Sequence, residues 1–306
     1  MTALAERLDR YLLLRRALGY QYQNQGRLLG EFVAFMAASK LTTVTVEAAL
    51  EWASGAPTDR MSATRLTAVR GFAGYLVAFD ERTQVPPSGL IHDIHVRPTP
   101  HIYSPSEITA LMAAASNLTP RLWAATMDTV IGLMAATGVR PGEIYRLGRA
   151  DVDLGDGQLA VMHSKYGKSR QIPLHPTTVQ MLHRYAQLRD RSFPDPLPTR
   201  FFVNADGAGL DSMAVTATFN RLLHVAAIAG TDSRRHPRLG SLRHTFAVST
   251  LLEWHHAGLD VQRQLPVLSA YLGHNEIAHT YWYLQATPEL MALAADRLES
   301  SWRDRP

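Results

Sequence analysis

Apolar residues recur at three- and four-residue steps through the first eighty positions of the chain, the spacing that places one apolar stripe along a helix. The pattern is present in four segments: 4–12, 24–39, 46–52 and 62–79. Thr45 stands directly before the third segment, where its hydroxyl can cap a helix. The pattern therefore predicts an N-terminal unit of four helices.

A proline-rich stretch follows this unit. Its prolines forbid a continuous helix, and they are Pro86, Pro87, Pro98 and Pro100. The stretch ends at Ser104, which precedes a proline and has Glu107 three residues further on, the sequence of a capping box at a helix start. We therefore expect an N-terminal domain over 1–84, a linker over 85–103 and a second domain over 104–306.

The second domain has a mainly helical pattern with one interruption. Helices are expected near 106–115, 121–137, 141–148, 176–190, 212–229, 242–257, 262–272 and 276–297. Between about 152 and 174, the apolar runs QLAVMHS and RQIPL enclose the polar residues KYGKS, an arrangement that predicts a β-hairpin with a glycine in its turn. The expected fold class is mainly α (α+β), with a small β-hairpin or sheet in the second domain.

The composition narrows the possible functions. None of the 306 residues is cysteine, which excludes disulfides, cysteine-ligated zinc and thiol catalysis. The formal net charge of +4 is compatible with nucleic-acid binding without establishing it. Because no apolar run reaches the roughly 18 residues that a membrane span needs, we expect a cytoplasmic protein that does not contact a membrane.

Five short segments carry residues that could perform chemistry. They are TGVRPGEIYRL with Arg140, SKYGKSRQIPL with Lys165, RLGSLRHTFAV with Arg243, LSAYLGH with His274 and HTYWYL with Tyr283. Each residue alone has an ordinary structural interpretation, as a surface arginine, a solvated turn lysine or a core tyrosine. Their joint order and spacing are far more informative than any one of them.

In this order the segments resemble the tyrosine recombinases of the phage integrase family. That family has an arginine after TG-x, a lysine in a hairpin, H-x-x-R-H at a helix start, LGH, and a tyrosine nine residues beyond the LGH histidine, the offset that separates His274 from Tyr283. The resemblance covers about residues 104–297, while the N-terminal unit fits the family's core-binding domain in size and composition only. It implies the DNA breaking-rejoining fold, with two domains that close as a clamp around double-stranded DNA.

The resemblance also implies DNA strand cleavage without a metal or another cofactor. Arg140 and Arg243 would hold the non-bridging oxygens of a pentacoordinate phosphorane, because each guanidinium offers a planar fork of donors with a permanent charge. Tyr283 would attack the phosphorus and form a 3′-phosphotyrosyl bond, Lys165 would protonate the leaving 5′-oxygen, and His274 would donate a hydrogen bond to the phosphate. Such enzymes act as homo-oligomers, with a dimer on each site and a tetramer in the synapse.

Three neighbouring residues compete with these or support them. Glu143 stands one turn after Arg140 on the same predicted helix and can orient it. Lys168 is an alternative to Lys165, which we prefer because the family's lysine precedes the turn glycine. Tyr281 is a rival nucleophile that lacks the nine-residue offset.

The chain departs from the family pattern at one catalytic position. Gly240 stands three residues before Arg243, where the family has the first histidine of H-x-x-R-H. That histidine helps to accept the tyrosine proton, and loss of one general base typically costs about 10²–10⁴-fold in rate. His236 and His244 are nearby substitutes, although His244 occupies a position that normally packs structurally in the family.

Basic residues are candidates for DNA phosphate contacts, which supply affinity without sequence information. They are Arg65, Arg70, Lys168, Arg170, Arg234, Arg235 and Arg238. Arg234, Arg235 and Arg238 are the better candidates because they stand just before the predicted helix that carries Arg243. Arg65 and Arg70 are ordinary surface charges unless the N-terminal unit grips DNA.

Two other functions stay open at this point. Gly240 motivates the first, a catalytically impaired family member that binds DNA as a structural or regulatory factor. The second is a type IB topoisomerase-like enzyme, which uses the same chemistry without synapsis. Integration, excision, transposition and chromosome resolution all use this scaffold, so the sequence does not select among them or identify the DNA site.

Overall fold

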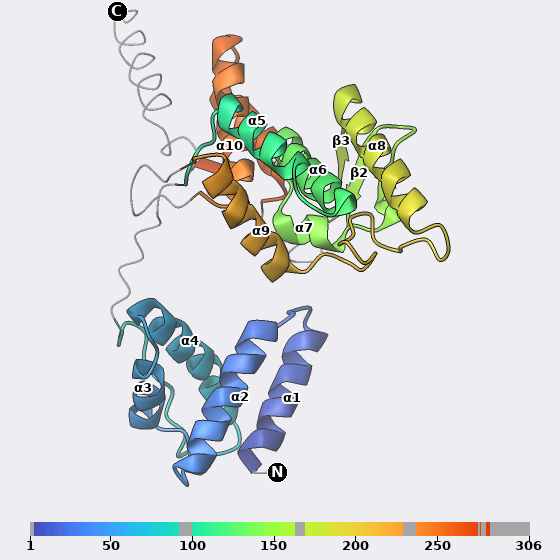
Figure 1. Cartoon of the computed structure of the whole chain (residues 1–306). Coiled ribbons are helices and arrows are strands. Elements are labelled where there is room, and N and C mark those ends of the chain that lie inside the picture. Colours follow the sequence, from blue (N-terminus) through green and yellow to red (C-terminus); the bar gives the residue numbers. More distant parts are fainter. Residues whose placement is uncertain are drawn as a thin grey trace, which may run out of the picture. The chain divides into compact units, whose positions relative to one another are not determined.

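The computed structural model describes residues 3–91, 100–162, 169–228 and 237–274, together with Glu276, Thr280 and Tyr281. The chain divides into two compact units, Met1–Arg97 and Pro98–Pro306, which are described separately (Figure 1). In the part of the chain that the structure describes, no helix combines the length and the apolar character needed to cross a bilayer.

Within residues 3–91, the first unit consists of helices joined by short turns. They are α1 (Ala3–Ala17), α2 (Gln23–Ala38), α3 (Val46–Ser54) and α4 (Asp59–Leu76). Thr45 caps α3 by accepting a hydrogen bond from the Ala48 amide at 3.2 Å, as the sequence predicts. Helix α4 begins before the predicted position 62, because Thr58 caps it by accepting a hydrogen bond from the Met61 amide.

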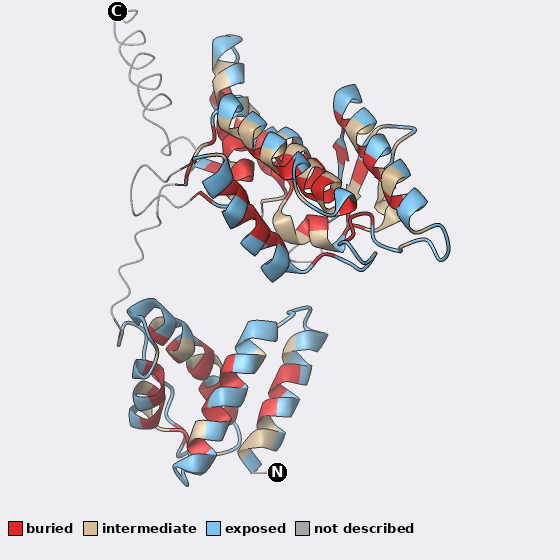
Figure 2. Cartoon of the chain, viewed as in Figure 1, coloured by how far each residue is buried: buried red, intermediate tan, exposed pale blue. Residues whose placement is uncertain are grey.

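The first unit has an apolar core of its own. Phe32 and Phe72 are completely buried, and the ring centroid of Trp52 lies 5.2 Å from that of Phe32. Tyr11 joins them from α1, with its ring centroid 5.4 Å from that of Phe72. Figure 2 shows buried residues along one side of each helix and exposed residues along the other, the arrangement that the apolar stripes predict.

The second unit is mainly helical with a small antiparallel sheet, which confirms the fold class expected from the sequence (Figure 1). Its helices are α5 (Pro105–Ser116), α6 (Arg121–Thr137), α7 (Pro141–Arg146), the 3-10 turn η1 (Arg149–Asp151), α8 (Pro176–Ser192), α9 (Ser212–Val225), α10 (Ser241–His256) and α11 (Val261–Leu272). Most of the helix expected over 276–297 lies outside the described residues.

The strands of the second unit form a sheet in the order β1-β2-β3. They are β1 (Val152–Asp153), β2 (Gln158–Val161) and β3 (Arg170–Pro173). Strands β2 and β3 pair antiparallel, with Leu159 opposite Ile172 and both side chains buried. These two strands correspond to the predicted hairpin, and the segment 163–168 between them lies outside the described residues.

The start of the second unit contains the capping box that the sequence predicts. The Ser104 hydroxyl accepts a hydrogen bond from the Glu107 amide at 3.1 Å, and the Glu107 carboxylate accepts one from the Ser104 amide at 2.7 Å. Just before it, the buried Tyr103 donates its amide to the Thr245 hydroxyl of α10 at 2.9 Å. The chain is thus fixed to α10 as it enters the second unit.

Helix α6 is the centre of the second unit and packs against α5, α8 and α10. Its residues Met127, Ile131 and Leu133 are completely buried. A further apolar cluster joins α10 to α11, with Leu251 and Leu265 completely buried in it. This packing fixes the start of α10 and the end of α11 next to the end of α6, where the candidate site lies.

Candidate active site

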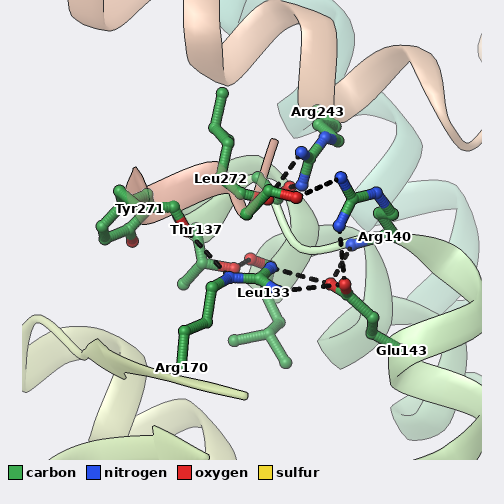
Figure 3. A network of polar contacts seen from close by, with 10 residues as sticks. Leu133, Thr137, Arg140, Glu143, Arg170, Arg243, Tyr271 and Leu272 are labelled. Atoms are coloured by element: carbon green, nitrogen blue, oxygen red, sulfur yellow. Dashed lines mark hydrogen bonds and ion pairs between the residues drawn. The ribbon is translucent and has the colours of Figure 1, made fainter. Parts of the chain in front are cut away.

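Three of the five predicted catalytic residues lie in the described part of the chain. Arg140 precedes α7, Arg243 lies in the first turn of α10, and His274 follows the end of α11. Hydrogen bonds join their segments into one cluster (Figure 3). Lys165 and Tyr283 lie outside the described residues, so their predicted roles stay predictions.

The glycine of the TGVR segment positions an arginine from a different segment. Helix α6 ends at Gly138, whose φ of 63° is the left-handed conformation that favours glycine at a helix C-terminus. A Cβ at this position would lie 2.6 Å from Cδ1 of Phe246, so the space is closed to other residues as well. The Gly138 carbonyl accepts a hydrogen bond from Nη1 of Arg243 at 2.8 Å.

The C-terminal end of α11 binds three arginines. The helix ends at Gly273, which also has a positive φ, of 68°. Three successive carbonyls accept one hydrogen bond each: Tyr271 from Nε of Arg170 at 2.8 Å, Leu272 from Nη2 of Arg243 at 2.7 Å, and Gly273 from Nη2 of Arg140 at 2.9 Å (Figure 3). Because the last carbonyls of a helix lack partners within it and form the negative end of its dipole, cations are stabilised there.

Glu143 is the carboxylate that binds two of these arginines. It is 6% exposed, and its oxygens accept hydrogen bonds from the Arg140 amide, from Nη1 of Arg140, and from both Nη1 and Nη2 of Arg170 at 2.9–3.0 Å. Burial acts to raise the pKa of the Glu143 carboxyl, but the hydrogen bonds from Arg170 and Arg140 outweigh it and hold that pKa at about 2. Glu143 is therefore a charged group under all ordinary conditions.

The two predicted catalytic arginines differ in exposure. The Arg140 side chain is 29% exposed, whereas Arg243 is 6% exposed. Arg140 uses Nη1 to reach Glu143 and Nη2 to reach the Gly273 carbonyl, so its guanidinium is held in place while part of it still faces solvent. A phosphate oxygen can approach an arginine that is anchored in this way without reorganising it.

His274 has a partner that the sequence analysis did not identify. Its Nδ1 lies 2.8 Å from the hydroxyl oxygen of Thr280, which is completely buried. A hydrogen bond at one ring nitrogen fixes the tautomer and the orientation of the imidazole. Thr280 lies on the sequence between His274 and Tyr283, but a single hydroxyl carries no periodic pattern that would have revealed this contact.

Gly240 lies directly before α10 and next to the segment that contains Arg140. Its φ of −62° and ψ of −17° are ordinary right-handed helical values, so a larger residue fits the backbone without strain. The nearest heavy atom to a Cβ at this position would be Cγ of Pro141, at 4.0 Å. The position therefore has room for a Cβ atom. His244, the residue directly after Arg243 in α10, is half-buried.

The predicted DNA-binding arginines have different surroundings. Arg238 is exposed just before α10. Arg65 donates to the Trp52 carbonyl at 3.2 Å, and Arg70 donates to the carbonyls of Pro86 and Pro87, so both are partly used within the first unit. Lys168, Arg234 and Arg235, together with His236, lie outside the described residues.

Arg170 has surroundings that differ from those of an exposed phosphate-binding residue. The sequence suggested a phosphate contact on the hairpin, but the Arg170 side chain is only 11% exposed and points into the cluster rather than to solvent (Figure 3). Its guanidinium is bonded to Glu143 and to the end of α11. The side chains of strand residues alternate between the two faces, and residue 170 lies on the inward face, which the sequence alone did not reveal.

Comparisons with known proteins identify the family to which the chain belongs. The model of the phage integrase family matches residues 102–289, and the chain therefore belongs to that family, the tyrosine recombinases. The match includes every segment that carries a predicted catalytic residue.

Individual relatives extend the similarity to the whole chain. The y4rB protein of Sinorhizobium fredii, named as an integrase/recombinase, is 37% identical over 315 residues that cover 100% of both chains. The tyrosine recombinase XerD of Chlorobaculum tepidum is 28% identical over 223 residues, which are 72% of this chain and 69% of its own. Among solved structures, the XerH site-specific recombinase bound to palindromic difH substrate has a similar fold, with a TM-score of 0.65, 18% identity, and coverage of 90% of this chain and 79% of its own.

The ionisation of Glu143 predicts a pH dependence of stability. Its pKa falls from an ordinary 4.5 to about 2 on folding, so its contribution is complete above pH 4.5 and is lost as the pH falls toward 2. The contribution is on the order of 3 kcal/mol. In denaturant titrations, Glu143→Gln should be less stable than the wild type at neutral pH, and the difference should shrink steadily below pH 4.5. A difference that stays constant down to pH 2.5 would contradict the low pKa.

The left-handed conformation of Gly138 in the TGVR segment predicts that adding a single methyl group there lowers the stability of the fold strongly. Gly138→Ala should lower the free energy of unfolding by at least about 2 kcal/mol, because it combines strain at a positive φ with a clash against Phe246. Gly142→Ala is the matched control, since its Cβ would meet nothing closer than Nη1 of Arg146 at 3.5 Å. Denaturant titration of both variants should show a loss only for position 138, and equal losses would refute this explanation.

Proposed function

We propose that this protein is a site-specific DNA recombinase that cuts and rejoins strands through a 3′-phosphotyrosyl intermediate without a metal ion. The observation that carries this proposal is the arginine pair. Arg140 and Arg243 come from segments about a hundred residues apart, and each binds a glycine carbonyl of another segment of the family pattern. Membership of the tyrosine recombinase family supports site-specific recombination.

The chemistry that we propose balances without a co-reactant. The Tyr283 hydroxyl gives up its proton to water as its oxygen attacks the phosphorus, the bond from phosphorus to the 5′-oxygen breaks, and Lys165 gives a proton to that oxygen and regains one from water. The phosphotyrosyl bond retains the energy of the phosphodiester, so a 5′-hydroxyl can reverse the reaction and rejoin the strand. Arg140 and Arg243 stabilise the dianionic phosphorane because their charge and donors are already in place when that charge develops.

His274 would complete the binding of the phosphate. The contact of Nδ1 with Thr280 directs the other ring nitrogen, Nε2, away from that hydroxyl. In the proposed mechanism Nε2 donates a hydrogen bond to a non-bridging oxygen. Thr280 supports this role because a hydrogen bond at Nδ1 fixes the orientation and the tautomer of the imidazole ring of a functional histidine.

The proposed substrate is double-stranded DNA, bound by a homo-oligomer. The exposed Arg238 lies just before α10 and five residues before the buried Arg243, where it can contact a backbone phosphate beside the cleaved one. The related XerH recombinase has been solved on its difH substrate, which supports duplex DNA as the ligand. By analogy with the family we propose a dimer on each site and a tetramer in the synapse.

Gly240 supports one alternative function, that of an impaired family member which binds DNA without efficient cleavage. The family histidine at this position helps to remove the tyrosine proton, and apart from the two residues adjacent to Gly240, the only described side chain within 4 Å of the Cβ position is that of Pro141. The arginine cluster would still bind the phosphate in such a protein. The two functions therefore differ in the cleavage step and agree on DNA binding.

The role of Tyr283 predicts a covalent product. On a DNA duplex with a nick close to the cleavage site, the released fragment diffuses away and the protein stays attached to the 3′-phosphate. The wild type should form an adduct that survives denaturing gel electrophoresis, and Tyr283→Phe should form none while it still binds the DNA. Tyr281→Phe is the matched control and should retain the adduct. Loss of the adduct in Tyr281→Phe alone would assign the nucleophile to Tyr281, and absence of an adduct in the wild type would favour the impaired alternative.

The space at Gly240 predicts a gain of activity. Gly240→His should fold normally, because the backbone is right-handed helical and the Cβ has free space. If the proton of Tyr283 is removed slowly in the wild type, the variant should form the covalent adduct about 10-fold to 10²-fold faster, within the range of a general base. Gly240→Ala controls for the side chain itself. An unchanged rate in Gly240→His would show that another group already accepts the proton.

A further inference from the structure

Arg170 makes more contacts within the cluster than a surface residue needs. It is the first residue of β3, yet its side chain reaches α7 and the end of α11 (Figure 3). Nη1 and Nη2 donate to the two oxygens of Glu143 at 3.0 and 2.9 Å, and Nε donates to the Tyr271 carbonyl at 2.8 Å. All three nitrogens of its guanidinium therefore have partners inside the protein.

The fit around Arg170 is tight enough to constrain a neighbouring motif residue. A Cβ on Gly273 would lie 2.9 Å from Nη1 of Arg170 and 3.2 Å from its Cζ. Two separate reasons thus favour glycine at position 273 of the LGH segment: its positive φ and the guanidinium beside it. Residue 273 must therefore lack a side chain for the Arg170 guanidinium to occupy its position.

Arg170 and Arg140 share Glu143 unequally. Arg170 faces the carboxylate as a fork, with one nitrogen on each oxygen, which is the strongest geometry for this pair. Arg140 uses one nitrogen of its guanidinium for the same carboxylate. The charge of Glu143 is therefore matched chiefly by Arg170, and Arg140 keeps its own charge for a ligand.

The formal charges of the cluster agree with this division. The guanidiniums of Arg140, Arg170 and Arg243 carry three positive charges. The Glu143 carboxylate carries one negative charge, so the cluster has a formal net charge of +2. A pentacoordinate phosphorane carries two negative charges, so the cluster matches the transition state of the proposed reaction. Without Arg170 the net charge would be +1, and Glu143 would compensate Arg140 instead.

We propose that Arg170 is a positioning residue for strand cleavage, which holds the Glu143 carboxylate and the end of α11 and so keeps the Arg140 guanidinium in place and available to the phosphate. This inference rests on the proposed function. It assigns Arg170 a role that acts through Arg140 and requires no contact with DNA.

The experiment compares binding with cleavage for Arg170→Gln. Equilibrium binding to the nicked duplex across a range of salt concentrations reports phosphate contacts, because each lost contact lowers the salt slope by about 1. Adduct formation at saturating DNA reports cleavage alone. Arg170→Gln should keep the wild-type slope and lose about 10-fold to 10²-fold in cleavage rate, less than the about 10²–10³-fold that loss of a direct transition-state donor costs. Arg238→Gln is the matched control, whose slope should fall.

A second variant separates charge balance from simple loss of structure. Arg170→Gln combined with Glu143→Gln removes one guanidinium and the carboxylate together, which restores the net charge of +2. The double variant should cleave about threefold or more faster than Arg170→Gln alone, because coupled neighbours show non-additive effects of this size. A purely structural arginine predicts the opposite order, since the double variant would have lost more contacts. Circular dichroism and thermal unfolding verify that each variant is folded.

Three results would overturn the inference. They are a lowered salt slope for Arg170→Gln with normal cleavage at saturation, an unchanged cleavage rate, and a double variant that is slower than the single one. If the wild type forms no adduct, the proposed function fails instead, and the inference is then decided by the pKa of the Glu143 carboxyl measured with ¹³C NMR. That pKa should rise toward its ordinary value in Arg170→Gln, and an unchanged value would remove Arg170 as the partner of Glu143.

Discussion

The hydrogen bonds between the C-terminal end of α11 and three arginines are the interaction on which the site depends. A helix end presents carbonyls that no residue of the helix can satisfy, and it carries a partial negative charge. Here Arg170, Arg243 and Arg140 bind three successive carbonyls, and Glu143 supplies the remaining negative charge. Guanidiniums that would repel one another are thereby held together, because the backbone and one carboxylate compensate them.

The two glycines of the family pattern, Gly138 and Gly273, take part in the same set of hydrogen bonds to arginines. Gly138 ends α6 and Gly273 ends α11, each in the left-handed conformation. The carbonyl of Gly138 binds Arg243, and that of Gly273 binds Arg140. The glycine carbonyl of each of these two segments thus holds an arginine that comes from another segment of the family pattern. A substitution at either glycine would therefore displace the bound arginine, although neither glycine carries a functional group.

The sequence predicted the parts of the structure that are set by local chemistry. The caps at Thr45 and Ser104 depend on residues three positions apart, and the helices depend on a short apolar repeat, so both could be recognised. The joint order of Arg140, Arg243 and the LGH segment identified a cluster through resemblance. The partners of Arg170 and Thr280 were missed, because the Arg170–Glu143 contact spans 27 positions and pairs residues of two different elements. Contacts between elements become visible only when the elements are packed.

The departure at Gly240 separates two tasks that a recombinase site performs. In the proposed mechanism the arginine cluster compensates the phosphorane charge, and its bonds to the carbonyls of Gly138, Leu272 and Gly273 do not involve Gly240. The same mechanism assigns the tyrosine proton to a general base, which is the group that the family has at the position of Gly240. In the proposed mechanism the arginine cluster stabilises the charged transition state, and the removal of the Tyr283 proton is a separate requirement. A Cβ on Gly240 would lie 4.0 Å from Cγ of Pro141, the residue after Arg140, so the proposed mechanism has room for a base near Arg140.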